Sequence, residues 1–160
     1  MSINEILEIK GYVINLVSYY PRTISEIRKR LLNKKFKPEN IEQAIKELSE
    51  KKYLDDEEYV REWLEKQLKY RPCGKMLCKA QLLKRGIEEE IADQVVQEEY
   101  SRDKELKIAQ GLVDKKFSKT LKSKDIDAQK NKNKLGNFLK NKGFSSEIIL
   151  EIINSDYELV

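Results

Sequence analysis

The chain contains no histidine and only two cysteines among its 160 residues. The commonest general base is therefore absent, and so are the Ser-His and Cys-His nucleophile pairs. Cys73 and Cys78 lack the further ligands that a tetrahedral zinc site needs, so we interpret them as small apolar residues at a helix start and on its inner face. No phosphate-binding glycine motif is present either. We therefore expect no enzyme, no metal and no cofactor, because carboxylates and lysines alone would have to do all the chemistry.

Long apolar runs are also missing, and proline and glycine are scarce. No run approaches the roughly 18–20 residues that a membrane span needs, and no signal-peptide pattern opens the chain. We expect a cytoplasmic protein that is monomeric and does not contact membranes. Only three prolines and six glycines interrupt the sequence, and apolar residues recur with the helical period of 3.6. This pattern predicts an all-α fold.

The sequence repeats itself three times. Phe36, Ile87 and Phe144 are equivalent anchors, 51 and then 57 residues apart, with matching apolar residues on both sides. Each anchor lies in a short basic turn between two helical segments, and a further apolar-periodic segment precedes each pair, at 12–20, 59–70 and 104–117. The expected fold is an elongated, curved array of three tandem three-helix repeats, with about nine short helices. The expected repeats are 1–54, 55–101 and 102–160, with a lysine-rich loop at about 118–127.

The turns carry the residues that helix ends require. Gly86 and Gly143 lie where a C-terminal cap needs positive φ, and Lys35 occupies the matching position in the first repeat. Pro38 suits a first helical position. An apolar residue before a cap and another at the fourth helical position form a staple, a spacing that explains the anchors without any function.

The stretch "LDDEEY" (54–59) contains four adjacent carboxylates. If Asp55 is the N-cap, Glu58 falls at the third helical position, which is the capping-box arrangement, and Leu54 with Tyr59 has the staple spacing. Asp56 and its neighbours then lie where the helix dipole favours negative charge. A metal site is the alternative, but consecutive helical residues point in different directions. We interpret the cluster as a helix start.

Charge is unevenly distributed along the chain. Residues 66–85 hold basic side chains and no acid, and residues 115–142 hold ten lysines against Asp125 and Asp127. Such blocks fit contact with a polyanion or with an acidic protein surface. Ordinary solvated helix faces explain each block equally well.

The stretch "YLDDEEYVREWLEKQLKYRPCGKMLCKAQLLKRGI" (53–87) resembles the middle-repeat signature of the RecX family of bacterial regulatory proteins. There a Leu-Asp-Asp, an aromatic residue one helical turn later and a closing Leu-x-x-Lys/Arg-Gly-Ile recur with this spacing. The stretches 25–56 and 138–153 are similar to the family's first and last repeats, so the resemblance covers about residues 12–153. Family members commonly carry Tyr-Gly-Pro where this chain has Cys73-Gly74-Lys75, and the basic run that follows is thinner here.

The resemblance implies a non-enzymatic regulator that lies in the groove of the RecA recombinase filament. Such a protein inhibits ATP hydrolysis, filament extension or strand exchange, and it can also touch single- or double-stranded DNA. The alternative from the residues is a DNA-binding protein whose basic helical repeats contact phosphates without sequence preference. The residues expected to contact the partner are Arg28, Arg30, Arg71, Lys75, Lys79, Lys84 and Arg85.

Overall fold

The computed structural model describes residues 3–117 and 128–158, and the predicted lysine-rich loop at about 118–127 lies outside them. Within the described residues the chain forms nine helices and no strand, which confirms the all-α prediction. The helices are α1 (Ile3–Tyr19), α2 (Ile24–Asn33), α3 (Pro38–Glu50), α4 (Asp56–Tyr70), α5 (Lys75–Lys84), α6 (Glu89–Glu99), α7 (Arg102–Phe117), α8 (Ala128–Asn141) and α9 (Ser146–Glu158).

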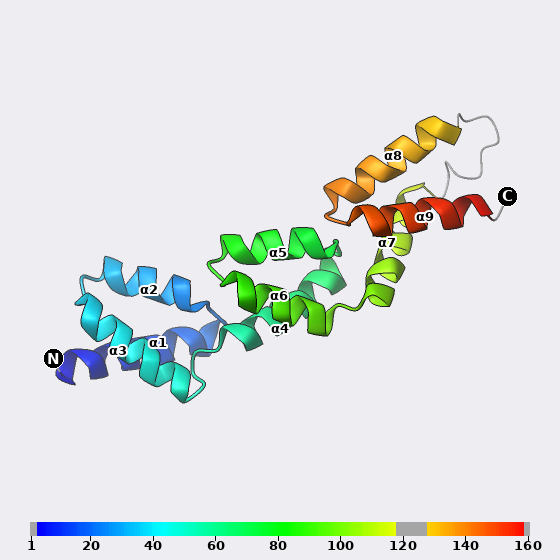
Figure 1. Cartoon of the computed structure of the whole chain (residues 1–160). Coiled ribbons are helices and arrows are strands. Elements are labelled where there is room, and N and C mark those ends of the chain that lie inside the picture. Colours follow the sequence, from blue (N-terminus) through cyan, green and yellow to red (C-terminus); the bar gives the residue numbers. More distant parts are fainter. Residues whose placement is uncertain (1–2, 118–127, 159–160) are drawn as a thin grey trace.

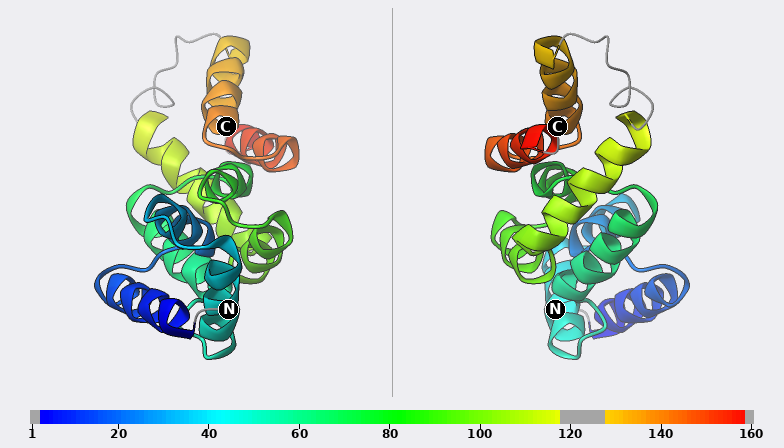
Figure 2. Two further views of the ribbon diagram at one scale, coloured as in Figure 1. Left: turned by 90° about the vertical axis from the view of Figure 1, so that its left-hand side faces the viewer. Right: turned by 90° about the vertical axis from the view of Figure 1, so that its right-hand side faces the viewer.

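The helices form an elongated array with the two termini at opposite ends (Figure 1). The second helices of the three units, α2, α5 and α8, follow one another along one side of the molecule. Views along the array show successive units turned relative to one another (Figure 2). This arrangement explains why the chain can present a long surface although each unit is small.

Three hydrophobic cores follow one another along the array. The first is built by α1, α2 and α3 around Ile9, Leu31 and Ile41. The second lies among α4, α5 and α6, and the third among α7, α8 and α9. The anchors Ile87 and Phe144 are buried in their cores, whereas Phe36 is only partly buried against the first. Each core is small, so contacts between neighbouring units contribute to the stability of the array.

Helix α1 begins nine residues earlier than the apolar segment 12–20 predicts. The additional turns place Ile6 and Ile9 in the first core, which extends the buried face of the helix. Gly11 interrupts the sequence pattern at this point, but a side chain added there would meet nothing within 4 Å, so packing does not require the glycine. The longer apolar stripe therefore outweighs the poor helix propensity of one glycine.

The turns before the anchors adopt the left-handed conformation. Gly86 and Gly143 have φ values of 85° and 86°, and Lys35 has 68° in the first unit. The last helical carbonyls are satisfied there, since the N–H of Ile87 donates to the carbonyl of Leu82 at 3.2 Å. Pro38 occupies the start of α3, where its missing N–H costs nothing.

The start of α4 differs in part from a complete capping box. Asp55 is the N-cap, and its carboxylate accepts a hydrogen bond from the N–H of Glu58 at 3.3 Å. The Glu58 carboxylate is paired with Arg61 at 3.6 Å instead of turning back to the cap. Leu54 belongs to the first core and Tyr59 to the second, so the staple pair is divided between two units.

Asp56 makes a contact between two units that the local sequence does not predict. Its side chain turns away from α4 and accepts a hydrogen bond from the N–H of Ile24, the first residue of α2, at 3.0 Å. Nearby, the Thr23 hydroxyl donates to the carbonyl of Arg85 at 3.1 Å. A side chain at Gly86 would meet Ser25 at 2.3 Å. We call this contact between the first and second units joint 1.

The second and third units meet in an equivalent contact, joint 2. Lys75 stands in the same place relative to its anchor as Ile24 does, and its N–H donates to the carboxylate of Glu105 at 3.1 Å. The N–H of Gly74 donates to the carbonyl of Lys142 at 2.7 Å, which corresponds to the Thr23–Arg85 contact. A side chain at Gly143 would lie 2.3 Å from Leu77. Both joints thus combine a carboxylate and a left-handed turn from one unit with the start of the second helix of the unit before it.

The carboxylates of both joints are buried. Asp56 is 8% exposed and Glu105 is 5% exposed. Burial raises the pKa of Asp56 above its ordinary value, although the hydrogen bond from Ile24 acts in the opposite direction. Because the folded-state pKa is raised, the folded state binds the proton more tightly than the unfolded state. The contribution of Asp56 to stability is therefore greatest below its unfolded pKa and falls as the pH rises through the folded pKa.

Two substitutions of Asp56 separate its hydrogen bond from its charge. Asp56→Ala leaves the N–H of Ile24 without a partner and is expected to lower the free energy of unfolding by about 1 kcal/mol. Asp56→Asn keeps an acceptor oxygen and removes the cost of burying a charge. Its stability relative to the wild type should therefore increase as the pH rises from about 4, the unfolded-state pKa of an aspartate, through the raised folded-state pKa. Urea unfolding at several pH values measures both effects, and equal losses in the two variants would contradict this role.

Candidate partner-binding surfaces

The seven basic residues predicted to contact a partner do not share one environment. Arg28 is held by a hydrogen-bonded ion pair with Glu42 at 2.7 Å, which raises the pKa of its guanidinium. Lys79 forms the corresponding pair with Asp93 at 2.9 Å. Both pairs join the second and third helices of a unit, and their members stand at equal distances from the anchors. Arg28 and Lys79 are therefore each already paired with a carboxylate of the same unit.

Two more members of the set are held by other contacts. Lys75 lies at joint 2, where its ammonium is 4.0 Å from the buried Glu105 carboxylate. Arg85 donates to the hydroxyl of Tyr59 at 3.0 Å, and its guanidinium lies 5.8 Å from the centre of the Trp63 ring. Lys75 is mostly buried, whereas Arg85 is exposed despite these contacts.

The remaining three residues, Arg30, Arg71 and Lys84, are exposed and form no ion pair within the described residues. Arg30 and Lys84 lie on α2 and α5, which follow one another on the same side of the array (Figure 1). Arg71 is the C-cap residue of α4, just before α5 begins. These three side chains, and Arg85, whose contacts with Tyr59 and Trp63 are not ion pairs, are available to a partner without breaking an ion pair.

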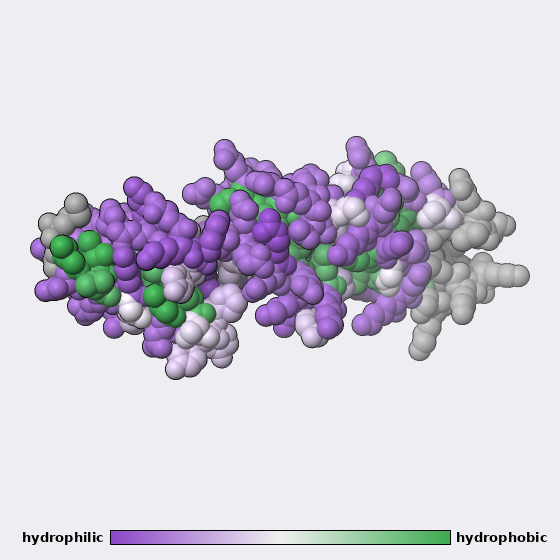
Figure 3. All heavy atoms as spheres, turned by 90° about the horizontal axis from the view of Figure 1, so that it is seen from below, coloured by the Kyte–Doolittle hydropathy of each residue, from purple (hydrophilic) through white to green (hydrophobic). Residues whose placement is uncertain are grey.

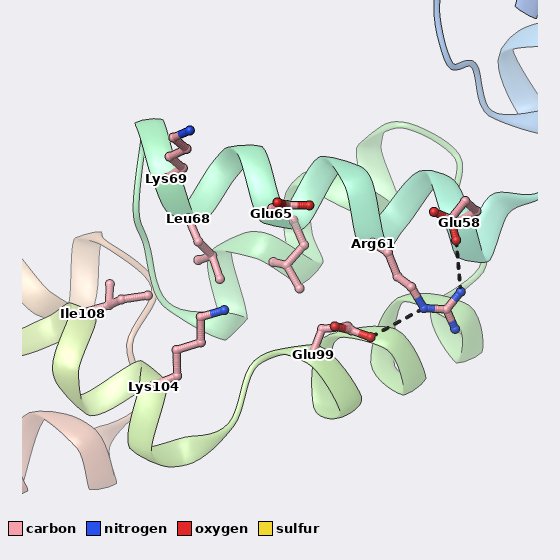
Figure 4. A pocket seen from close by; sticks show the side chains of 9 residues that line it. Glu58, Arg61, Glu65, Leu68, Lys69, Glu99, Lys104 and Ile108 are labelled. Atoms are coloured by element: carbon pink, nitrogen blue, oxygen red, sulfur yellow. Dashed lines mark ion pairs between the residues drawn. The ribbon is translucent and has the colours of Figure 1, made fainter.

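A groove lies between α4, the end of α6 and α7, with a volume of about 630 Å³. Its lining combines the apolar side chains of Leu64, Leu68 and Ile108 with charged ones. Figure 4 shows Arg61, Glu99 and Lys104 among the charged side chains. Arg61 forms ion pairs at 3.5–3.8 Å with four carboxylates, two from α4 and two from α6: Glu57, Glu58, Glu98 and Glu99. We call this set the Arg61 network. Its central side chain links two helices that have an excess of negative charge.

The second core, next to joint 2, contains the two cysteines. Their sulfur atoms are 3.2 Å apart and both residues are buried. Their shared hydrogen bond lowers the pKa of Cys73 and raises that of Cys78. The hydroxyl of Tyr100, which is buried in the same core, donates to the carbonyl of Cys73 at 2.8 Å. In the described part of the chain no group of three Cys, Asp or Glu side chains is arranged to hold a metal ion.

Exposed apolar residues gather at the N-terminal end of the array. Ile3, Leu7 and Ile14 are exposed on α1, and the face shown in Figure 3 has hydrophobic atoms at this end among a mainly hydrophilic surface. None of the described helices is both long enough and apolar enough to cross a membrane.

The Arg61 network gives a prediction about salt. Arg61→Met leaves four carboxylates close together without their shared cation, so we expect a loss of up to about 1 kcal/mol in the free energy of unfolding at low ionic strength. Added salt should narrow this difference, because it screens the remaining repulsion. Thermal unfolding at low and high salt measures the effect.

Arg102→Met is the matched control for this prediction, since Arg102 pairs with a single exposed carboxylate among the described residues, that of Glu151 on α9. If both variants change the melting temperature equally at every salt concentration, the Arg61 network contributes no more to stability than a single exposed ion pair does.

Comparisons with known proteins identify the family. The residues 103–153 match the family model described as "RecX, third three-helix domain", and residues 10–48 match "RecX, first three-helix domain". A regulatory protein RecX from Clostridium tetani is 30% identical over 148 residues, which cover 92% of this chain and 67% of the relative. A regulatory protein RecX from Chlorobium limicola is 29% identical over 146 residues, which cover 91% of this chain and 87% of the relative.

Solved structures show the same fold. The crystal structure of RecX from Lactobacillus salivarius superposes with a TM-score of 0.87 at 23% identity and covers 99% of this chain and 100% of that one. A second crystal structure, of a regulatory protein RecX, has a TM-score of 0.78 at 22% identity and covers 94% of this chain and 72% of that one. With three-helix units that match the family models and a relative at 30% identity over most of both chains, this chain belongs to the RecX family of regulatory proteins.

Proposed function

We propose that this chain binds the filament of the RecA recombinase and inhibits its ATP hydrolysis, its extension and its strand exchange. Membership of the RecX family carries the proposal, since the relatives are named regulatory proteins. On this proposal the chain regulates recombination and DNA repair in the cytoplasm, and it acts by binding, not by catalysis. Its units are the repeats 1–54, 55–101 and 102–160.

The shape of the array supports a long contact with a filament. Three small cores follow one another, and α2, α5 and α8 lie along one side of the array. Side chains from several units can therefore contact one extended partner. Extended surfaces of this kind are what stacked helical repeats commonly use for binding. The groove between successive subunits of a helical filament provides a long surface that such an array can contact.

The charges on α2, on α5 and at the end of α4 suggest which residues make the contact. Arg28 and Lys79 are already paired within their units, so using them would first break an ion pair. Arg30, Arg71 and Lys84 are exposed and carry no such cost. We propose these three as the main partner contacts, with Arg85 beside them, and we give Arg28, Lys75 and Lys79 a supporting role in holding the helices.

The test is the rate of ATP hydrolysis by RecA on single-stranded DNA. The wild-type chain should lower this rate when it is present at less than one molecule per RecA subunit. The variant Arg30→Glu, Arg71→Glu, Lys84→Glu should need about tenfold more protein for the same inhibition, because three exposed charge contacts contribute roughly 0.5 kcal/mol each.

The matched control is Lys46→Glu, Lys66→Glu, Lys107→Glu, which changes the net charge equally at exposed positions on α3, α4 and α7. It should inhibit as the wild type does. An absence of inhibition by the wild type at a one-to-one ratio would overturn the proposed function. Equal losses in the two variants would show that inhibition depends on the net charge of the chain and not on these three positions.

A further inference from the structure

The two cysteines occupy the positions of a hydrophobic staple at the start of α5. Gly74 is the N-cap of α5, so Cys73 precedes the cap and Cys78 is the fourth helical residue. This spacing brings two side chains together at a helix start, which explains their contact in the second core. A staple needs only apolar side chains, however, and the same positions of the first unit hold Arg22 and Ile27. Neither the staple nor the repeat accounts for a thiol at both positions.

The two sulfur atoms are close to the separation that a disulfide bond requires. They lie 3.2 Å apart. A disulfide bond is about 2.0 Å long, so the atoms would approach each other by about 1.2 Å, which small changes in the side-chain torsions of both residues provide. Cys73 and Cys78 are the only cysteines of the chain. The only disulfide that can form within one chain therefore joins these two residues.

The surroundings give the two thiols different reactivities. The hydrogen bond with Cys78 has the largest effect on Cys73 and lowers its pKa, and Gln67 and Lys142 act in the same direction. The same hydrogen bond, together with burial, raises the pKa of Cys78. Because the thiolate is the nucleophile, Cys73 is the attacking group and Cys78 remains a thiol beside it. A thiol of lowered pKa next to a second thiol is typical of cysteine pairs that respond to oxidants.

Small oxidants reach Cys73 through the connection between α4 and α5. The connection consists of residues 71–74, and Arg71 at its start is exposed. Cys73 is 2% exposed, whereas Cys78, inside the helix, is 0% exposed. Local opening of this short segment therefore uncovers Cys73 first. The reaction is expected to be slower than that of a fully exposed thiol.

The pair encloses the backbone donors of joint 2. Three consecutive N–H groups between the cysteines donate to acceptors in the third unit. Donors and acceptors pair as Gly74 with Lys142, Lys75 with Glu105 and Met76 with Gly143. A bond between the two sulfur atoms would place these three donors inside a short covalent ring. Such a ring restricts the open conformations of the first turn of α5, so it would hold the second unit more firmly on the third.

We propose that Cys73 and Cys78 form a reversible disulfide in response to a peroxide, and that this bond tightens joint 2. The Cys73 thiolate attacks one oxygen of hydrogen peroxide, which leaves a sulfenic acid on Cys73 and releases hydroxide that takes up a proton to become water. The Cys78 sulfur then attacks the Cys73 sulfur, and the sulfenic hydroxyl leaves with the Cys78 proton as a second water. The two sulfur atoms together lose two electrons, and the peroxide gains them. Exchange with a dithiol reverses the bond. The proposal does not depend on the RecA contact.

The experiment treats the reduced full chain with hydrogen peroxide and follows the mass of the intact protein. The expected product is a monomer that is lighter by the mass of two hydrogen atoms and has no thiol left to alkylate. Dithiothreitol should restore the original mass. The same treatment in urea measures the reaction of the exposed thiols. If the thiols of the folded chain stay unreacted at peroxide concentrations that oxidise the chain in urea, burial protects them and the proposal is wrong.

Two single variants test the roles of the two thiols. Cys78→Ala retains the attacking thiol and should accumulate a sulfenic acid on Cys73, which dimedone traps. Cys73→Ala retains only the thiol of raised pKa and should react at least about tenfold more slowly. Thermal unfolding of both variants shows whether the second core is intact, and the wild-type experiment does not depend on them. Reaction of Cys73→Ala as fast as that of Cys78→Ala would contradict the assignment of Cys73 as the attacking thiol.

Amide hydrogen exchange of the wild-type chain measures the effect on joint 2. In the disulfide form, Lys75 and Met76 should exchange about tenfold more slowly than in the thiol form, because the cross-link suppresses opening of the first turn of α5. Ile24 at joint 1 is the internal control and should exchange at the same rate in both forms. Exchange of Lys75 and Met76 that is equally fast or faster in the disulfide form would overturn the proposed tightening.

Discussion

A buried carboxylate at the start of one unit caps the second helix of the unit before it, and this contact occurs twice. Asp56 accepts the first N–H of α2, and Glu105 accepts the first N–H of α5. The first N–H groups of a helix have no partner within the helix, so they need one from elsewhere when they are buried. Here the neighbouring unit supplies the partner. The directions of α2 and α5 are thereby tied to the units that follow them.

The close contact between units explains why glycine is required at the joints. The carbonyl of Gly143 accepts the N–H of Met76 at 3.1 Å, and a side chain on Gly143 would collide with Leu77. At joint 1, a side chain on Gly86 would collide with Ser25. The left-handed turns therefore serve two purposes: they end a helix, and they allow the next backbone to approach closely. Close approach at both joints places the second helices along one side of the molecule.

The sequence predicts the elements well and the contacts between units poorly. The helical period and the anchors predict the array, because buried faces must repeat every 3.6 residues. The acidic stretch predicts a helix start at Asp55, but nothing local distinguishes Asp56, which turns to another unit, from its neighbours. The same limit applies to basic residues. Lys75 and Lys79 lie in a basic stretch that is typical of a binding surface, yet both form ion pairs with carboxylates that are distant in sequence. Arg28 and Lys79 stand equally far before their anchors, and Glu42 and Asp93 stand equally far after them. This repeated spacing is the one sequence signal of such an ion pair.

The central claim is that neighbouring units cap the second helices, and amide hydrogen exchange of Ile24 and Lys75 followed by NMR tests it most directly. First-turn amides of a helix usually exchange fast, and Glu39 in the first turn of α3, which has no side-chain cap, provides the internal reference. The account predicts that Ile24 and Lys75 exchange more slowly than Glu39, and that Glu105→Ala removes the protection of Lys75 while leaving that of Ile24. Exchange of Ile24 and Lys75 as fast as that of Glu39 in the wild-type chain would contradict it.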